Sequence, residues 1–223
     1  MRINKFVAQS TGLSRRAADR AIAEGRVKLN QRAATLGDEV IESSDSVTLD
    51  NKPITPAVKT ITIMLNKPSG YVCSRDGQGS QTIYELVPKE HHVLKPIGRL
   101  DKNSSGLILL TNDGDLANQL THPRYGKTKV YQISLSTSLA PLHQQMINDI
   151  GVQLEDGRSQ LTLQKLDEAG NDWQITMQEG RNRQIRRTFE SLGYTVTKLH
   201  RTVFGPYRLD QMSPTQRYMI VED

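Results

Sequence analysis

A carboxylate in a polar loop is the first feature of this sequence that could carry chemistry. Residues 98–101 read Gly-Arg-Leu-Asp, and a short polar stretch then leads into the apolar run 107–110. Such a loop can hold the Asp101 carboxylate at the mouth of a cleft, where it could act as a nucleophile. A bare Arg-x-Asp pattern is more often structural, with the aspartate capping a turn or pairing with Arg99. The pattern alone leaves both interpretations open.

A second candidate is a group of four arginines at the predicted start of a helix, within residues 179–187. The four are Arg181, Arg183, Arg186 and Arg187. Cations are unfavourable at a helix N-terminus, so an anion should compensate them. The functional interpretation is contact with phosphates, with one arginine pairing with a catalytic carboxylate. The alternative is a solvated helix face whose surface ion pairs contribute little.

Two further segments lie on predicted strands. Residues 129–131, Lys-Val-Tyr, open one strand, and residues 198–205 read Lys-Leu-His-Arg-Thr-Val-Phe-Gly. By themselves these residues indicate only an ordinary strand tyrosine, Tyr131, with its hydroxyl at the surface.

The charge distribution favours an anionic partner. The chain of 223 residues has a formal net charge of +5. Residues 1–32 contain eight Arg or Lys and two acidic residues, and residues 179–201 contain six basic and two acidic residues. Clustered positive charge is typical of proteins that bind a phosphate backbone, although an ordinary solvated surface can also carry it.

Several functional classes find no support in the composition. Hydrophobic residues make up 36% of the chain. We expect no membrane partner, because no window approaches the roughly 18 apolar residues of a spanning helix. No signal peptide is evident, and the single cysteine, Cys73, cannot form an internal disulfide, so we expect a cytoplasmic protein. The histidines show no metal-ligand spacing, and no Gly-rich nucleotide loop is present, so we expect no metal and no cofactor.

The elements that must position these residues form two predicted domains. Residues 1–58 contain a helix near the N-terminus, a helix over 15–24 that Ser14 caps, and strands near 27–29, 39–41 and 46–49. A linker with Pro53 and Pro56 follows. Residues 59–223 form the second domain.

The second domain is predicted to be mixed, with strands in the majority. Alternation and apolar runs predict strands over 61–65, 106–111, 129–135, 161–166, 173–178 and 194–200. Helices are predicted over 115–120, 139–150 and around Ile185, Phe189 and Leu192. The fold class is therefore α+β.

The motifs together resemble a known enzyme family. The segment GRLDKNSSGLILLTNDG at 98–114 is similar to the motif of the pseudouridine synthases that modify small- and large-subunit ribosomal RNA, and EGRNRQIRR at 179–187 resembles the family's later motif. The resemblance extends from residue 1 to about residue 205. It implies a largely antiparallel catalytic domain.

The first part of the chain resembles an S4 RNA-binding domain. The residues that carry the likeness are MRINKFVAQSTGLSRRAADRAIAEGRVKLN followed by Gly37-Asp38-Glu39-Val40. The resemblance implies that basic residues of this domain hold structured RNA through phosphates. The implied contacts are Arg2, Lys5, Arg15, Arg16, Arg26 and Lys28, joined in the second domain by Arg181, Arg183, Arg187 and Arg201.

The resemblance also assigns the catalytic residues. It makes Asp101 the nucleophile, Arg186 its arginine partner, which keeps the carboxylate ionised and oriented, and Tyr131 the residue that stacks on the target base. It makes Leu199 an apolar wall of the substrate pocket, which Arg99 also lines. Pseudouridylation breaks and remakes a glycosidic bond without redox change, so no cofactor is implied. Direct attack on the ribose and formation of a glycal intermediate both stay open.

Two other functions compete with this interpretation. A non-catalytic RNA-binding or ribosome-assembly factor would use the same basic surfaces, but an aspartate in a basic cleft would repel its phosphates. A nucleic-acid hydrolase would use Asp101 with a metal site of several carboxylates, whereas Asp113 and Asp115 stand where they would cap a helix.

The resemblance implies that the RNA partner is ribosomal RNA or a ribosome-assembly intermediate. Residues 151–157 and the Arg-Asn-Arg-Gln run resemble the large-subunit group, so 23S RNA is favoured over 16S RNA. We expect a monomer.

Overall fold

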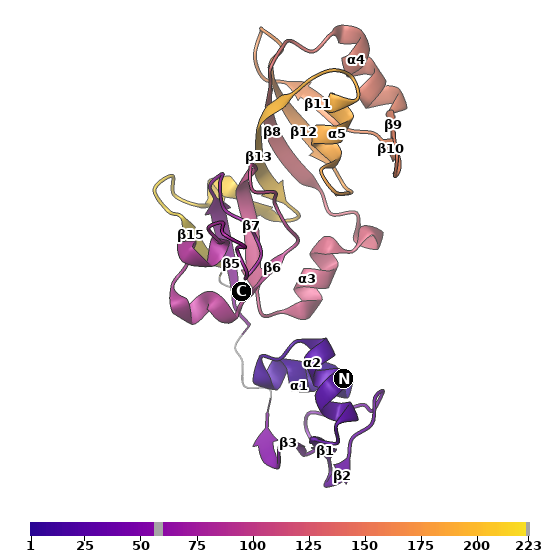
Figure 1. Cartoon of the computed structure of the whole chain (residues 1–223), viewed down its shortest axis with the longest axis vertical. Coiled ribbons are helices and arrows are strands. Elements are labelled where there is room, and N and C mark those ends of the chain that lie inside the picture. The colour runs from indigo at the N-terminus through magenta and orange to yellow at the C-terminus, as the bar shows by residue number, and fades with distance from the viewer. Residues whose placement is uncertain (56–59, 222–223) are drawn as a thin grey trace. The chain divides into compact units, whose positions relative to one another are not determined.

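The chain divides into two compact units, Met1–Thr60 and Ile61–Asp223. The structure, a computed structural model, describes residues 1–55 and 60–221 (Figure 1). The predicted domain boundary between residues 58 and 59 lies outside the described residues. Within them, none of the helices has the length and apolarity needed to cross a membrane.

The first unit packs two helices against a small sheet. Its core contains Ile3, Phe6 and Val7 from the first helix and Ala18 and Ile22 from the second, together with residues of the strands. The sheet order is β2-β1-β3-β4, with antiparallel neighbours. The elements are α1 (Ile3–Thr11), α2 (Arg15–Ala23), β1 (Val27–Leu29), β2 (Arg32–Ala33), β3 (Val47–Leu49) and β4 (Lys52–Ile54).

The sequence determines both ends of α2. The Ser14 hydroxyl accepts a hydrogen bond from the Ala17 amide at 3.1 Å, as the predicted cap requires. Gly25 follows the helix with φ +71°, and the Arg26 amide then reaches back to the Ala21 carbonyl at 3.0 Å. The predicted helix over 15–24 is therefore confirmed to within one residue.

Two expectations for this unit were wrong. The strand predicted over 39–41 is reduced to an isolated bridge between Arg2 and Glu39. Pro53, which was expected in a linker, lies in β4. Proline has no amide to donate, and β4 tolerates it because it is the last strand of the sheet.

The second unit is built on one long sheet. The strands run in the order β11-β12-β8-β13-β7-β5-β15, with β14 on β13 and β6 on β7. Among these pairs β13 and β7 are parallel, and the others are antiparallel, which confirms the α+β class. A separate hairpin joins β9 to β10. The strands are β5 (Thr62–Lys67), β6 (Lys95–Ile97), β7 (Ser105–Thr111), β8 (Lys129–Leu135), β9 (Val152–Leu154), β10 (Gly157–Ser159), β11 (Thr162–Lys165), β12 (Asp172–Met177), β13 (Val196–Phe204), β14 (Tyr207–Arg208) and β15 (Tyr218–Val221).

Both faces of the sheet are covered near its centre. In β7, Ile108 and Leu110 belong to the larger core cluster, whereas Leu107 and Leu109 belong to a smaller one. Successive strand side chains point to opposite faces, so the two clusters lie on the two faces. The helix α5 packs on the larger cluster and α3 on the smaller one. The α-helices in the described part of the unit are α3 (Gly114–Thr121), α4 (Pro141–Gln145) and α5 (Gln184–Glu190), and short 3-10 helices span Ile83–Leu86, Lys89–Val93, Pro123–Tyr125 and Leu209–Gln211.

The helix predicted over 139–150 is shorter and less regular than expected. The α-helix α4 ends at Gln145, and Met146–Ile150 continues as a π-helix. Single π turns inside helices are a known departure from the α pattern that periodicity does not reveal. The segment ends at Gly151, which has φ +79°.

Gly106 allows β7 to approach β13. Its φ is +102°, and a Cβ built there would lie 2.2 Å from the Arg201 carbonyl oxygen. The parallel pairing places His200 beside Ser105 and Arg201 beside Gly106. This contact brings the loop that precedes β7, with Asp101, next to the middle of β13.

Candidate active site

Most of the predicted site residues of the second unit line one cavity of about 460 Å³, but Arg186 and Arg187 do not. The size falls in the roughly 300–1,000 Å³ range of small-molecule sites. Residues 98–101, Tyr131, Leu199 and Arg201 line it, together with residues 177–185 from the end of β12 to the start of α5.

The Asp101 loop connects β6 to β7 and is held from behind by a buried thiol. Cys73 Sγ donates to the Leu100 carbonyl and accepts from the Leu100 amide, both at 3.3 Å. Burial raises the pKa of this thiol, so it stays protonated. The Ser104 amide closes the turn on the Asp101 carbonyl at 3.0 Å. Asp101 therefore has a fixed backbone, while its side chain is 36% exposed to the cavity.

A buried ammonium group lies under the same loop. Lys67, the last residue of β5, is fully buried, and its Nζ donates to the carbonyls of Tyr71 at 2.8 Å, Pro68 at 3.0 Å and Lys102 at 3.5 Å. Burial lowers its pKa, and the Asp101 charge opposes that shift. Lys67 ties the residue after Asp101 to the end of β5.

A further wall of the cavity comes from a cross-strand pair. In the register of β8 and β13, Tyr131 lies beside Arg201 and Ile133 beside Leu199. Tyr131 and Leu199 are each 8% exposed, and Arg201 is 3% exposed. Leu199 and Arg201 are two residues apart on one strand, so they face the same side as Tyr131. The predicted stacking residue and apolar wall therefore share one surface with the buried arginine.

The arginine that pairs with Asp101 in this structure is Arg183. Its Nη1 lies 3.5 Å from Asp101 Oδ2. The predicted partner, Arg186, instead donates to the carbonyls of Val196 at 2.6 Å and Asn103 at 3.0 Å. The pairing expected from the sequence is corrected on this point, because two backbone acceptors hold the Arg186 guanidinium. Burial lowers the pKa of Arg186, and Arg183 lowers it further, whereas Asp101 opposes the shift.

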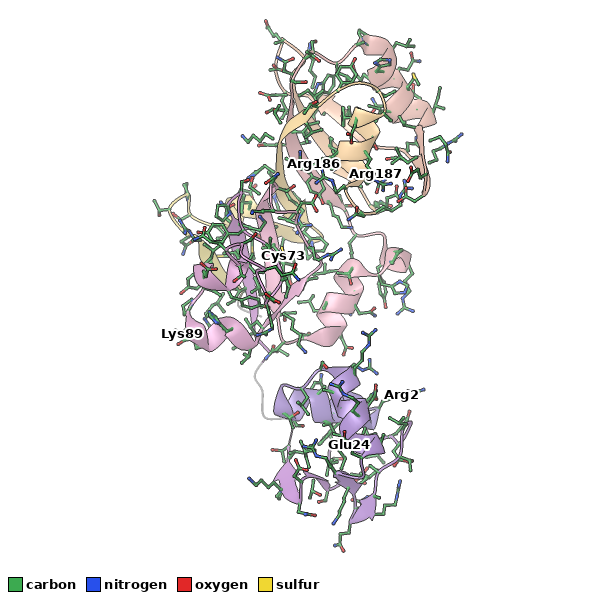
Figure 2. All side chains as sticks on the ribbon, in the orientation of Figure 1. Arg2, Glu24, Cys73, Lys89, Arg186 and Arg187 are labelled. Atoms are coloured by element: carbon green, nitrogen blue, oxygen red, sulfur yellow. The ribbon has the colours of Figure 1, made fainter. Side chains whose placement is uncertain are left out.

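Arg181 and Arg187 were expected to be RNA contacts or structural ion pairs, and in this structure both are engaged within the protein. Arg187 binds Asp156 with both Nη atoms, at 3.0 and 2.7 Å, and Arg181 Nη1 binds the same carboxylate at 2.9 Å. Arg181 also donates to the carbonyls of Gly157 and Arg158. These contacts clamp the turn of the β9–β10 hairpin to the start of α5, from which Arg186 and Arg187 project (Figure 2).

The remaining basic residues of the cavity differ in exposure. Arg99 is exposed at the rim. Lys129 is half-buried and donates to the Gln178 carbonyl at 3.1 Å; burial lowers its pKa and the Arg201 charge lowers it further. Arg201 is too buried to be the surface phosphate contact that the sequence suggested. Its Nε donates to the Leu107 carbonyl at 2.7 Å.

The candidate RNA contacts of the first unit lie mainly at its surface. Lys5 is half-buried, whereas the others are exposed: Arg2, Arg15, Arg16, Arg26 and Lys28. Arg26 is bound by Asp50 through two hydrogen bonds, at 2.7 and 2.6 Å, and by Glu24 at 3.2 Å. Lys28 donates to Asn51, and Arg15 to Asn4. The described part of the chain shows no group of three His, Cys, Asp or Glu side chains arranged to hold a metal ion.

Comparison with known families identifies the family of the chain that carries this site. The model of the RNA pseudouridylate synthase family matches residues 61–191, which contain the Asp101 loop, Tyr131 and the arginines of α5. The chain belongs to this family. A pseudouridine synthase is an isomerase, so the protein is an enzyme. The S4 domain model matches residues 1–47, which confirms the predicted nature of the first unit.

Relatives of the synthase match along nearly all of its length. An RNA pseudouridine synthase of Aquifex aeolicus is 37% identical over 222 residues, covering 96% of this chain and 88% of that protein. A ribosomal large subunit pseudouridine synthase B of Pseudomonas aeruginosa is 36% identical over 97% of this chain, which spans 58% of that protein. A crystal structure of a pseudouridylate synthase matches with a TM-score of 0.68 and 28% identity, covering all of this chain and 96% of the other.

Four residues that contribute to the synthase site were not identified from the sequence. They are Lys67, Cys73, Asp156 and, as the partner of Asp101, Arg183. Lys67 had a detectable signal, because it ends an otherwise apolar strand just before Pro68. Cys73 and Asp156 act across chain separations of 27 and 31 residues, which local patterns do not reveal.

Proposed function

We propose that this synthase isomerises uridine to pseudouridine in ribosomal RNA, with Asp101 as the nucleophile. The observation that carries the proposal is the meeting of Asp101, Tyr131 and Leu199 in one cavity, with Arg183 against the carboxylate. A partly exposed carboxylate opposite an aromatic ring suits a nucleotide whose base has been turned out of its helix.

Each side chain has a distinct part in the proposed reaction. Tyr131 stacks on the extruded uracil, and Leu199 shields it from water on the β13 side. Asp101 faces the ribose, either attacking its anomeric carbon or assisting formation of a glycal. Arg183 orients the carboxylate through its ion pair, while Arg186 fixes the end of the loop through the Asn103 carbonyl. Arg99 at the rim contacts the flanking RNA backbone.

The S4 unit supplies the second part of the RNA surface. Phosphate contacts from Arg2, Arg15 and Arg16 position a structured RNA without reading its sequence. Lys5, Arg26 and Lys28 join them, and Arg26 gives up part of its binding to Asp50 when a phosphate approaches. The favoured target is 23S RNA, because the Pseudomonas relative acts on the ribosomal large subunit.

The decisive experiment maps pseudouridine chemically in ribosomal RNA from cells that lack the gene. Wild type restores the missing pseudouridine, and Asp101→Asn does not, since an amide is a poor nucleophile; in vitro the single-turnover rate falls at least about 10⁴-fold. RNA affinity stays within about threefold, because phosphates carry most of it. Asp149→Asn, the same change at an exposed position, is the control and restores the modification.

Two results would count against the proposal. Turnover by purified Asp101→Asn would exclude Asp101 as the nucleophile. An unchanged pseudouridine map in the deletion strain would exclude ribosomal RNA as the substrate, and the enzyme would then act on another RNA.

A further inference from the structure

Arg201 is a buried cation without a carboxylate partner. It is 3% exposed, in the middle of the sheet, and no carboxylate in residues 1–55 or 60–221 lies within 4.0 Å of it. Its Nε donates to the Leu107 carbonyl, but Nη2 is buried and has no hydrogen-bond partner. An unpaired buried charge is costly, so such an arrangement calls for an explanation.

The contacts that Arg201 does make are aromatic. Its guanidinium carbon lies 4.6 Å from the centre of the Phe204 ring and 6.0 Å from the centre of the Tyr131 ring. The faces of aromatic rings attract cations, but more weakly than an anion at the same distance. The positive charge of Arg201 is therefore only partly balanced inside the protein.

The unbalanced charge acts on the contents of the cavity. Arg201 lines the cavity beside Tyr131 and on the same face of β13 as Leu199. Asp101 does not neutralise it, because that carboxylate is paired with Arg183. Lys129, which also lines the cavity, adds a second cation on this side. Whatever lies against Tyr131 thus sits in a positive potential.

In the proposed reaction, which this inference assumes, the base becomes negative for a limited time. When the C1′–N1 bond breaks, its electron pair stays with uracil and spreads over N1 and the two carbonyl oxygens. When the C5–C1′ bond forms, the ring supplies the electron pair, and C1′ gives up its bond to the Asp101 carboxylate or, in a glycal, the double bond to its neighbouring ribose carbon. C5 then releases its proton and N1 takes one up, so that the product is an isomer of uridine. The account holds for direct attack and for a glycal intermediate.

We propose that Arg201 stabilises the detached uracil anion. A cation fixed in a dry site before the reaction stabilises developing negative charge without reorganising. The neutral base of the bound substrate gains less from the same charge, so the effect lowers the barrier to bond cleavage. In the free enzyme Arg201 has no anionic partner. During the reaction the departing base serves as that partner.

The test compares two leaving groups in the full-length enzyme. RNA with uridine or 5-fluorouridine at the target is mixed with excess enzyme, and single-turnover cleavage of the C1′–N1 bond is followed as loss of the starting nucleoside by nuclease digestion and mass spectrometry. Fluorine at C5 leaves no proton to release there, so the loss of the starting nucleoside, and not the appearance of pseudouridine, is compared between the two substrates. Fluorine withdraws electrons and makes the base a better leaving group. Arg201→Met is expected to slow uridine by about 100-fold and 5-fluorouridine by at least about tenfold less. RNA affinity should stay within about threefold.

Control variants separate this role from a structural one. Arg201→Lys keeps the charge and should restore most of the uridine rate with the wild-type substrate ratio. Arg208→Met, the same change at an exposed arginine bound to Asp210, should behave as wild type. If Arg201→Met fails to fold by circular dichroism, Arg201→Gln takes its place under the same criterion.

Equal slowing of both substrates would overturn the proposal, as would weaker RNA binding with an unchanged substrate ratio. The wild-type enzyme is first measured with uridine. If it converts no uridine, the result rejects the proposed function and does not test the role of Arg201.

Discussion

Arg183 has an unfavourable backbone conformation, and its side chain contacts Asp101, the candidate nucleophile. As the N-cap of α5 it has φ 47°, in the left-handed region that side chains other than glycine rarely adopt. Such a conformation costs of order 1 kcal/mol and persists where the surroundings impose it. Here it directs the guanidinium to Asp101. The strain is consistent with a residue retained for activity and not for stability.

Replacing Arg183 by glycine should therefore separate stability from activity. Glycine adopts φ 47° without strain, and the ion pair it removes is exposed and contributes at most about 1 kcal/mol. We expect the free energy of unfolding, measured in urea, to stay equal or rise slightly. The single-turnover rate should fall by at least about tenfold as Asp101 loses its partner.

The control is Gln31→Gly, which removes the strain of a similar left-handed backbone conformation, φ 70°, in the first unit. It should leave the rate unchanged. Wild-type activity in Arg183→Gly would show that the ion pair with Asp101 has no role in the reaction.

Among the elements, the junction of β7 and β13 depends on Gly106. A methyl group there would meet the backbone of Arg201 at 2.2 Å, and φ +102° is unfavourable for alanine. Since main-chain atoms cannot move aside cheaply, we expect Gly106→Ala to reduce the free energy of unfolding by more than about 3 kcal/mol. Activity should fall as well, because the Asp101 loop is placed by this junction.

Gly114→Ala provides the matched comparison. No atom lies within 4 Å of a Cβ built at Gly114, and its φ is not positive. A urea midpoint close to that of wild type is expected. Equal midpoints for the two alanine variants would mean that the strands separate readily at Gly106.

A turn of the S4 unit should show a pH dependence of its own. The Asp38 carboxylate accepts from Arg32 and from the Thr35 amide, each at 2.9 Å. These bonds, that of Arg32 first, lower the pKa of Asp38 to about 2. A lowered folded pKa stabilises the fold above the unfolded value, and the gain disappears as pH falls from about 4 towards 2.

Nuclear magnetic resonance can follow the Asp38 carboxyl carbon through this range. We expect its midpoint near pH 2, and a smaller decrease in thermal stability between about pH 5 and pH 2.5 in Asp38→Asn than in wild type. A midpoint close to that of an unperturbed aspartate would contradict the hydrogen bonds from Arg32 and Thr35.

Local sequence predicted those elements whose ends and periodicity are determined by near neighbours. The alternation over 129–135 corresponds to β8, and Ser14 caps α2 as expected. It did not predict β15, whose residues 218–221 become a strand only by pairing with β5. The π-helix after α4 also departs from the pattern that its sequence suggests.

The candidate site was predictable to the level of its residues but not of its contacts. Asp101, Tyr131 and Leu199 were named from the sequence and lie on one cavity. The choice of Arg183 over Arg186 depends on a left-handed cap and on two distant carbonyls. The burial of Arg201 depends on packing between strands that are far apart in the sequence. A local sequence pattern does not reveal it.

The whole molecule consists of two units with separate cores, an S4 unit and a unit that contains the cavity. The S4 core draws on the first unit alone, and the two clusters of the second unit draw on the second alone. Removing residues 1–60 should therefore leave the catalytic unit folded. It should weaken binding to large RNA and flatten the salt dependence of log K, because fewer phosphates are neutralised.

Filter binding across a series of potassium chloride concentrations measures that slope. We expect it to fall in magnitude by roughly 0.7 to 0.9 for each phosphate that the S4 unit neutralises in the full-length enzyme. The rate at saturating RNA should stay within about threefold of wild type, because the cavity is built from the second unit. An unchanged slope would show that the S4 unit does not touch the RNA backbone.

The parallel pairing of β7 with β13 also sets an order of events during synthesis. Ser105 and His200, hydrogen-bonded at 2.8 Å, are 95 residues apart in the chain. The first unit is complete by residue 60, and N-terminal domains generally fold first as they leave the ribosome. The wall that faces Asp101 cannot form until β13 has emerged. A nascent chain therefore presents a folded RNA-binding unit well before it has an active site, and can engage RNA while still unable to modify it.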